Sequence, residues 1–342
     1  MATKLTVGVI GLGFGRQHLK AALDYGAEIG AICDILPEKL QTYGELYNIP
    51  EERRVTDWHD VLNNPEIDTV IIATPDQIHR EMSVAMLEVG KNVLCEKPLA
   101  LTREDMVAIA KASQVSTGKF MVGQIARFTP AFIKAKEFID NGTIGEIYYV
   151  ESEYAHDYEK MLRSVPNHWR TDPLRHGVVG GGCHAVDLLR WLVGNPTEIT
   201  AYGVHKLLPM VPYDDTTISI LRFPNNVIGK IFVSTGCKRN YTMRTLIYGT
   251  RGTIICDNTS DHMQLFTIGE DGMSVNNEPE IIPIDVNNHN ALREFEVFAD
   301  CIVNGKTVET DALEGAKTVE VCLSIVNSSV KGEAVKPNYN FE

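Results

Sequence analysis

The sequence predicts an α/β protein with two domains, the first built on a doubly wound parallel sheet and the second on a largely antiparallel sheet. Through about residue 120, short runs that are apolar on both faces alternate with amphipathic helical stretches, as in βαβ units. Beyond about residue 125, strand-like segments follow one another without helices between them. The length of 342 residues fits this division, which we place at residues 1–124 and 125–342.

The first domain is expected to contain five buried parallel strands. Each run is short, lies between turn or polar residues, and shows no polar face, which is typical of a strand covered on both sides. The five runs are Leu5–Ile10, Ile29–Cys33, Thr69–Ala73, Asn92–Cys95 and Phe120–Val122. Between them, apolar residues recur at helical spacing, for example at Met82, Ala85, Met86 and Val89.

The second domain is expected to begin with a helix at Pro130–Asn141. Six strand-like segments then follow, joined mainly by turn residues: Glu146–Tyr154, Thr216–Phe223, Val227–Ser234, Met243–Tyr248, Gly252–Cys256 and Met263–Ile268. Three further helices are predicted from apolar periodicity and terminal glycine or asparagine residues, at His184–Leu192, Ala291–Ile302 and Leu313–Val330.

Composition excludes several classes of function. The 32 basic and 45 acidic residues give a net charge of −13, which provides no general attraction to nucleic acid or to an anionic membrane. No apolar run is long enough to span a bilayer. The seven cysteines are dispersed without a CxxC pair, so we expect neither disulfides nor a metal site. With no signal-peptide pattern in the first ten residues, these observations favour a cytoplasmic protein.

A glycine-rich turn follows the first strand and precedes an apparent helix. Glycines at such a turn let a pyrophosphate approach backbone N–H groups at the positive end of a helix. An acidic residue ends the second strand about 20 residues later, where it can bind ribose hydroxyls. Arg16 stands where a third glycine is usual, so Gly15 is expected to take that packing role. The predicted dinucleotide contacts are Gly11, Leu12, Gly13, Phe14, Gly15, Arg16 and Asp34.

Two more segments lie at the carboxyl ends of predicted strands, where ligands bind in open α/β sheets. Thr74-Pro75, with His79 four residues on, fits either a cofactor contact or a turn with a capping histidine. Glu96-Lys97 follows the fourth strand and fits either a cleft-facing pair or a surface ion pair. A lysine near a cationic nicotinamide ring would have a lowered pKa and can serve in acid/base chemistry.

The order of these motifs resembles the Gfo/Idh/MocA oxidoreductase family, named for glucose–fructose oxidoreductase and inositol dehydrogenase. Beyond the segments above, the stretch 85–100, AMLEVGKNVLCEKPLA, is close to the family's most specific signature. Residues 123–130, which include Arg127, and 249–252 also match family segments. The resemblance covers essentially the whole chain.

This resemblance implies a Rossmann domain, an α+β domain with an open sheet that packs against another subunit, and NAD or NADP. It places Glu96, Lys97 and Arg127 near the cofactor, with Lys97 at the reacting carbon. It also makes His184 the second catalytic residue, in the motif Gly182-Cys183-His184-Ala185-Val186-Asp187. The family's aspartate four residues before this histidine is replaced by Gly180, and Asp187 can either orient His184 or pack.

Substrate contacts are expected in the second domain, in segments rich in aromatic and hydrogen-bonding groups. Such groups suit a polyhydroxylated ligand, although a polar surface loop has the same composition. The candidates are Tyr154, His156, His168, Arg170 and Asp187. Because Lys97 and His184 belong to different domains, the sequence predicts an active site in the cleft between them.

The sequence therefore predicts an NAD-dependent oxidoreductase that acts on a secondary alcohol of a sugar, cyclitol or related polyol. The alternatives are a glycosidase- or epimerase-like enzyme with transient oxidation, and a non-catalytic NAD-binding regulator. We expect NAD to be preferred over NADP because Asp34 repels a 2′-phosphate and Arg16 is the one nearby basic residue. A homodimer or homotetramer is expected, since an open antiparallel sheet has an apolar face to cover.

Overall fold

The computed structural model describes residues 4–165, 167–269, 272–273, 275 and 278–341, and the chain divides into two compact units. The first unit comprises Met1–Gln124, Asn290–Ala316 and Asn340–Glu342, and the second comprises Ile125–His289 and Lys317–Tyr339. This division departs from a single cut after residue 124. The reason is α10 (Ala291–Val303), which packs on α1 (Gly15–Tyr25) through an apolar face.

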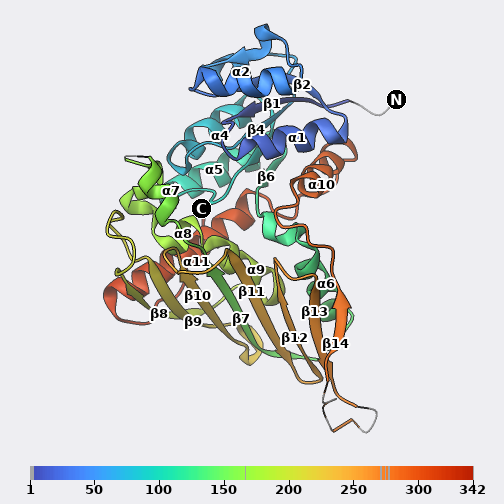
Figure 1. The fold of residues 1–342 in the computed structure, drawn as a ribbon, viewed down its shortest axis with the longest axis vertical. Helices are drawn as coiled ribbons and strands as arrows, with labels where there is room; N and C mark the ends of the chain where they lie inside the picture. The colour runs from blue at the N-terminus through green and yellow to red at the C-terminus, as the bar shows by residue number, and fades with distance from the viewer. Residues whose placement is uncertain (1–3, 166, 270–271, 274, 276–277, 342) are drawn as a thin grey trace. The chain divides into compact units, whose positions relative to one another are not determined.

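The first unit is built on a parallel sheet of six strands in the order β3-β2-β1-β4-β5-β6 (Figure 1). The strands are β1 (Thr6–Ile10), β2 (Glu28–Cys33), β3 (Arg54–Val55), β4 (Thr69–Ile72), β5 (Asn92–Cys95) and β6 (Phe120–Val122). The side chains of these strands other than β3 are almost entirely buried, as a sheet covered on both faces requires. The expected doubly wound sheet is confirmed, and β3 is a short edge strand added to it.

Helices connect these strands and begin at identifiable signals. Besides α1 and α10, the helices are α2 (Pro37–Leu46), α3 (Trp58–Asn63), α4 (His79–Glu88) and α5 (Arg103–Val115). Proline opens α2, while the side chains of Asp57 and Thr102 accept backbone N–H hydrogen bonds at the starts of α3 and α5. The connections place the loops after β1, β4 and β5 at the carboxyl edge of the sheet.

The second unit is built on eight strands in the order β14-β13-β12-β11-β7-β10-β9-β8 (Figure 1). The strands are β7 (Ile147–Ala155), β8 (Glu198–Val204), β9 (Thr216–Arg222), β10 (Ile228–Ser234), β11 (Thr242–Gly249), β12 (Gly252–Asp257), β13 (His262–Thr267) and β14 (Glu280–Pro283). Strands β10 and β7 pair in parallel, and the other pairs are antiparallel. The expected mostly antiparallel sheet is therefore confirmed.

Helices cover one face of this sheet. They are α6 (Pro130–Asp140), α7 (Glu159–Ser164), α8 (Gly177–Gly180), α9 (Cys183–Val193) and α11 (Ala312–Lys331). Helix α9 packs on β7 and β10, and α6 packs on β12. The described part of the chain also contains 3₁₀ turns at Glu51–Arg53, Asp76–Ile78, Ile125–Phe128, Trp169–Thr171, Pro173–Arg175 and Pro224–Asn226.

Alternation along the strands separates a buried face from an open one. Strand β9 shows this most clearly, because Thr217, Ser219 and Leu221 are buried while Ile218 and Ile220 are exposed. No helix among the described residues is both long and apolar enough to cross a membrane.

Candidate functional site

The turn between β1 and α1 carries the expected pyrophosphate-binding residues. Gly11 to Phe14 form the turn, and α1 begins at Gly15. Phe14, at the N-cap, provides no side-chain hydrogen bond to the described residues of α1. The backbone N–H groups at the positive end of this 11-residue helix therefore suit an anionic group.

Gly15 performs the packing expected of the third glycine. A Cβ atom at residue 15 would lie 3.0 Å from the Cβ of Ala73 and 3.4 Å from the Cγ1 of Val9. Glycine thus lets α1 approach the sheet closely. Arg16 is exposed instead, and its guanidinium donates a hydrogen bond to the carbonyl of Gly13.

Asp34 is buried directly after β2 and is held against the glycine turn. Its Oδ2 accepts a hydrogen bond from the backbone N–H of Leu12 at 2.7 Å, and its Oδ1 accepts one from Leu36 at 3.0 Å. The Nζ of Lys39 also lies 3.1 Å from Oδ2. The expectation that Arg16 is the one basic residue nearby is therefore wrong, because the first turn of α2 brings Lys39 back to the strand end.

His79 connects two loops at the carboxyl edge of the sheet. Its Nδ1 lies 2.9 Å from the carbonyl oxygen of Pro98, and its Nε2 lies 3.2 Å from that of Thr74. Burial opposes the charged form, but Cys95, Asp76 and the Pro98 carbonyl together raise the pKa of His79 to about 10. With both ring nitrogens donating to backbone carbonyls, His79 holds the Thr74-Pro75 loop rather than presenting a free nitrogen to a ligand.

Glu96 is also held from within the first unit. Its Oε1 lies 2.7 Å from the Nε2 of His18, and its Oε2 accepts a hydrogen bond from the backbone N–H of Lys97 at 3.1 Å. Burial works against ionisation, but the hydrogen bond from His18, and the charge and backbone N–H of Lys97, outweigh it and lower the pKa of Glu96. The carboxylate therefore fixes the backbone at Lys97, whose side chain is half-buried.

In the second unit, His184 is the second residue of α9 and is 1% exposed. Its ring stacks on Tyr154, with centroids 5.9 Å apart, and meets the edge of His289 at 6.0 Å. Tyr154 belongs to β7, so the packing of α9 on β7 brings the two expected residues together.

Phenol and imidazole groups surround this pair. The hydroxyl of Tyr154 lies 3.1 Å from the Nδ1 of His156 and 2.8 Å from the hydroxyl of Tyr158. The ring of Tyr241 lies 4.7 Å from that of His156, and its buried hydroxyl has no hydrogen-bond partner within the described residues. Burial raises the pKa values of Tyr154 and Tyr241 far above that of a free phenol, so both are neutral hydrogen-bond donors.

Two more of the expected substrate residues, His168 and Arg170, lie beside Trp169. The Nδ1 of His168 accepts a hydrogen bond from the backbone N–H of Arg170 at 3.1 Å. The guanidinium carbons of Arg170 and Arg175 lie 4.1 and 4.8 Å from the ring centroid of Trp169. Burial, and then the charges of both arginines, lower the pKa of His168.

Arg175 occupies the space beside Gly180. A Cβ atom at residue 180 would overlap the guanidinium of Arg175, which also donates a hydrogen bond to the Gly180 carbonyl at 3.2 Å. Arg175 is 2% exposed and is stacked on Trp169, so it has little freedom to move away. The position that carries an acid in the related family thus adjoins a buried cation here.

Asp187 does not face His184 but binds other groups of the second unit. Its carboxylate forms a bidentate ion pair with Arg127, with both N–O distances 2.7 Å. It also accepts a hydrogen bond from the Thr318 hydroxyl at 3.0 Å and lies 3.9 Å from Arg190. These contacts join the 3₁₀ turn Ile125–Phe128 to α9 and α11. They assign Arg127 and Asp187 to a buried ion-pair network.

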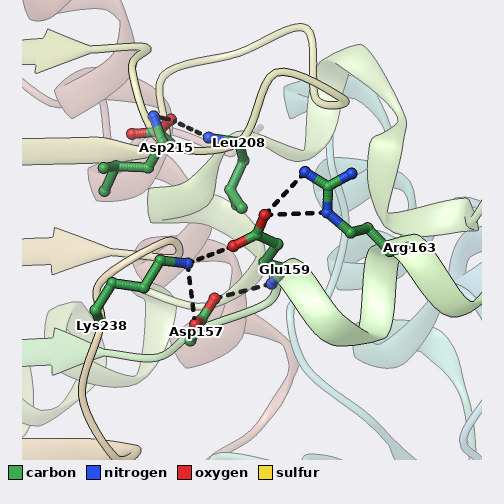
Figure 2. Close-up of polar contacts among 7 residues, drawn as sticks. Asp157, Glu159, Arg163, Leu208, Asp215 and Lys238 are labelled. Atoms are coloured by element: carbon green, nitrogen blue, oxygen red, sulfur yellow. Dashed lines mark hydrogen bonds and ion pairs between the residues drawn. The ribbon is translucent and has the colours of Figure 1, made fainter.

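An ion-pair group fixes the loop that follows His156. Lys238 lies 3.1 Å from the Oδ2 of Asp157 and also pairs with Glu159, which in turn accepts hydrogen bonds from Arg163 (Figure 2). The hydrogen bonds from Lys238 and Arg163 lower the pKa of Glu159, and those to Glu159 and Asp157 raise the pKa of Lys238. The carboxylates of Asp157 and Glu159 therefore stabilise the conformation of this loop through ion pairs.

Sequence reasoning missed Tyr241, His289 and Lys39. Tyr241 and His289 reach the Tyr154 group from distant loops, and their spacing carries no signal. Lys39 could have been found, because a helix predicted to begin at Pro37 has Lys39 in its first turn, next to the end of the strand that carries Asp34. Within the described residues, no cluster of three or more histidine, cysteine, aspartate or glutamate side chains fits a metal ion.

Comparison with known proteins agrees with this arrangement. Residues 5–124 match the model of an oxidoreductase family with an NAD-binding Rossmann fold, and residues 132–255 match the Gfo/Idh/MocA C-terminal domain. Levoglucosan dehydrogenase of Pseudarthrobacter phenanthrenivorans is 29% identical over 293 residues, which is 73% of each chain. The scyllo-inositol 2-dehydrogenase (NAD(+)) of Bacillus subtilis is 27% identical over 350 residues, covering 98% of this chain and 97% of its own.

Solved structures resemble the whole chain. A levoglucosan dehydrogenase in complex with NADH superposes with a TM-score of 0.89 at 25% identity, covering 98% of this chain and 100% of that one. The same enzyme with NADH and levoglucosan gives a TM-score of 0.88 at 25% identity, covering 99% and 100%. From its two domain matches and its fold, the chain belongs to the Gfo/Idh/MocA family of oxidoreductases.

Proposed function

We propose that this protein is an NAD-dependent dehydrogenase of a secondary alcohol in a sugar, cyclitol or related polyol. The observation that carries the proposal is the group around His184. This buried histidine stacks on Tyr154. The phenols of Tyr158 and Tyr241 and the imidazoles of His156 and His289 lie close to this pair. Hydroxyl and imidazole groups beside aromatic rings suit a ligand that presents several hydroxyls and C–H faces. Inositol and levoglucosan dehydrogenases among the relatives support the same class.

The residues of the first unit fit NAD. We assign the β1–α1 turn to the pyrophosphate, Asp34 to the adenosine ribose, and Lys97 to the nicotinamide side. When bound, NAD supplies the acceptor for the hydride that leaves the carbinol carbon. His184 takes the hydroxyl proton during oxidation, and Lys97 polarises the substrate oxygen. Tyr154 and Tyr241 donate hydrogen bonds to neighbouring hydroxyls.

Gly180 favours one second candidate, an epimerase- or glycosidase-like reaction with transient oxidation. At the position where relatives carry an aspartate, this chain has Gly180 beside the buried Arg175. A proton taken up by His184 would therefore reach bulk water by a different route than in those relatives. In such a reaction the substrate would recover, within the same cycle, the hydride that it gave to NAD. The protein would then retain NAD tightly and turn over without added cofactor.

A substrate screen distinguishes the two. The purified protein is incubated with cyclitols, sugars and glycosides with and without added NAD+, while absorbance of the reduced nicotinamide is followed. Product analysis is run on the same samples. Stoichiometric formation of NADH with a ketone product supports the dehydrogenase. Changed products without NADH support the second candidate, and no reaction with any polyol contradicts both.

We propose a preference for NAD over NADP. Asp34 accepts a hydrogen bond from the ribose 2′-hydroxyl and repels a 2′-phosphate, and Lys39 offsets part of that repulsion. A hydrogen bond to a charged group contributes about 1.5–3 kcal/mol, so kcat/KM should favour NAD by about 10-fold or more. Asp34→Ser should remove most of this preference, whereas Lys39→Gln should increase it. Equal kcat/KM values with both cofactors in the wild type would contradict the assignment.

We also propose a cytoplasmic homodimer or homotetramer that associates through the open face of the second sheet. None of the seven cysteines, which all lie within the described residues, forms a disulfide bond, and this suits a reducing compartment. On the open face, Tyr202, Ile218, Ile220 and Ile228 are 41–70% exposed. Exposed apolar side chains on neighbouring strands are typical of an interface.

Light scattering should therefore give the mass of a dimer or tetramer at micromolar concentration. Ile220→Glu should lower that mass, because it would bury a charge in the interface. Val115→Glu serves as the matched control, because Val115 is an exposed apolar residue at the end of α5 in the first unit and does not belong to this sheet. A monodisperse wild-type monomer would exclude the interface.

A further inference from the structure

A buried acid with no assigned role lies behind Glu96 and Lys97. Glu294 is on α10, which packs against α1, and its side chain is fully buried. Neither of its carboxyl oxygens has a hydrogen-bond partner in the described part of the chain. The Nδ1 of His18 lies 3.9 Å from the Oε2 of Glu294, and this nitrogen also has no hydrogen-bond partner among the described residues.

His18 connects this acid to the proposed active-site lysine. While Nδ1 faces Glu294, Nε2 lies 2.7 Å from the Oε1 of Glu96. The Oε2 of Glu96 accepts the backbone N–H of Lys97. A line of four groups therefore runs from α10 through α1 to the loop after β5, all within the first unit.

Electrostatic repulsion between Glu96 and Glu294 determines which of the two carboxyl groups is protonated. Glu96 is ionised, and two carboxylates sharing one histidine in a buried space repel each other. Burial, and then the negative charge of Glu96, raise the pKa of Glu294 well above its ordinary value. An unpaired buried carboxylate costs much more than a neutral acid, whereas a neutral acid has an O–H to donate.

We propose that Glu294 is a neutral carboxylic acid that donates a hydrogen bond to Nδ1 of His18 and so acts as a positioning residue for Lys97. In this state the separation between Oε2 of Glu294 and Nδ1 of His18, 3.9 Å in the structure, would shorten to hydrogen-bond length. With Nδ1 accepting, His18 is held as the tautomer that carries its proton on Nε2. The Nε2–H group donates to Oε1 of Glu96 and fixes this carboxylate. The other oxygen of the carboxylate can then accept the backbone N–H of Lys97.

This role rests on the proposed dehydrogenase function, but the protonation can be tested without activity. The infrared difference spectrum between wild type and Glu294→Gln at pH 7 should show the carbonyl band of a protonated carboxyl group. Nitrogen-15 NMR of labelled histidine, assigned with His18→Asn, should show His18 as the neutral Nε2–H tautomer. A missing carboxyl band, or a doubly protonated His18 paired with ionised Glu294, would overturn the proposal.

Activity provides the second test, with variants that separate positioning from structure. Glu294→Gln keeps a neutral donor and should retain kcat within about 3-fold, whereas Glu294→Leu should lower kcat by about 10-fold, with the KM for NAD nearly unchanged. The leucine variant should also unfold at a lower temperature, because Nδ1 of His18 loses its proposed donor and stays buried. A purely structural role predicts this loss of stability without a lower kcat in the folded protein.

Glu296→Gln is the matched control, since Glu296 lies on the same helix but on the surface, paired with Arg293 at 3.2 Å. It should change neither kcat nor the spectra. Wild-type kcat in Glu294→Leu would overturn the positioning role. If no polyol is oxidised by any variant, the proposed function fails, and the infrared and NMR spectra still decide the state of Glu294.

Discussion

Lys97→Met and His184→Asn are each expected to lower turnover by roughly 100-fold or more, the usual scale for a lost general acid or base. Lys97 follows a carboxylate that is fixed by His18, and His184 is held by stacking on Tyr154. The backbone of Lys97 and the ring of His184 are thus both held in place. Methionine and asparagine preserve approximate size while removing the groups that exchange protons.

Steady-state kinetics on the identified substrate measures this effect, and cofactor binding provides its control. Neither change alters the glycine turn or Asp34, so NAD should still bind with nearly the wild-type Kd in a fluorescence titration. Near-wild-type turnover in His184→Asn would show that the family role is wrong at this position. The base would then have to be sought among His156, His168 and His176.

Asp187→Asn is expected to destabilise the fold by about 3–5 kcal/mol, the cost of removing one partner from a buried ion pair. The change leaves the buried Arg127 and Arg190 without the carboxylate that both contact. An orienting residue for His184 would mainly affect turnover. The observed contacts instead predict that the loss appears in the free energy of unfolding.

Denaturant unfolding measures this prediction. Asp24→Asn is the matched control, because Asp24 forms an exposed i,i+4 pair with Lys20 at 2.6 Å. Exposed pairs contribute little, so this variant should change stability by less than about 1 kcal/mol. An Asp187→Asn protein as stable as the control would mean that the arginines find other partners, and the network would not be required.

The extent to which the fold could be predicted depended on burial. The buried strands of the first unit, such as Asn92–Cys95 and Phe120–Val122, agree with their apolar runs to the residue, because a strand covered on both faces has no polar positions. Strand β14 was missed since its residues are mostly exposed, and β3 has only two residues. The parallel pairing of β10 with β7 depends on tertiary arrangement that local pattern does not encode.

The candidate site, too, could be predicted from the sequence only in part. The glycine turn, Asp34 and Lys97 were predicted because each follows a recognisable strand. The pairing of Arg127 with Asp187 was not, since it joins residues 60 positions apart and appears only when α9 packs against the preceding turn. Glu294 lies still farther along the chain from His18. Contacts of this kind are set by packing and carry no local sequence signal.

Arg175 and Gly180 form an epistatic pair. An acid introduced at residue 180 alone would crowd a buried guanidinium that is stacked on Trp169. Removing the arginine first would leave a cavity in a tightly packed interior. Each single change is therefore expected to lower stability. We expect laboratory evolution to reach an acid beside His184 more readily when residues 175 and 180 change together.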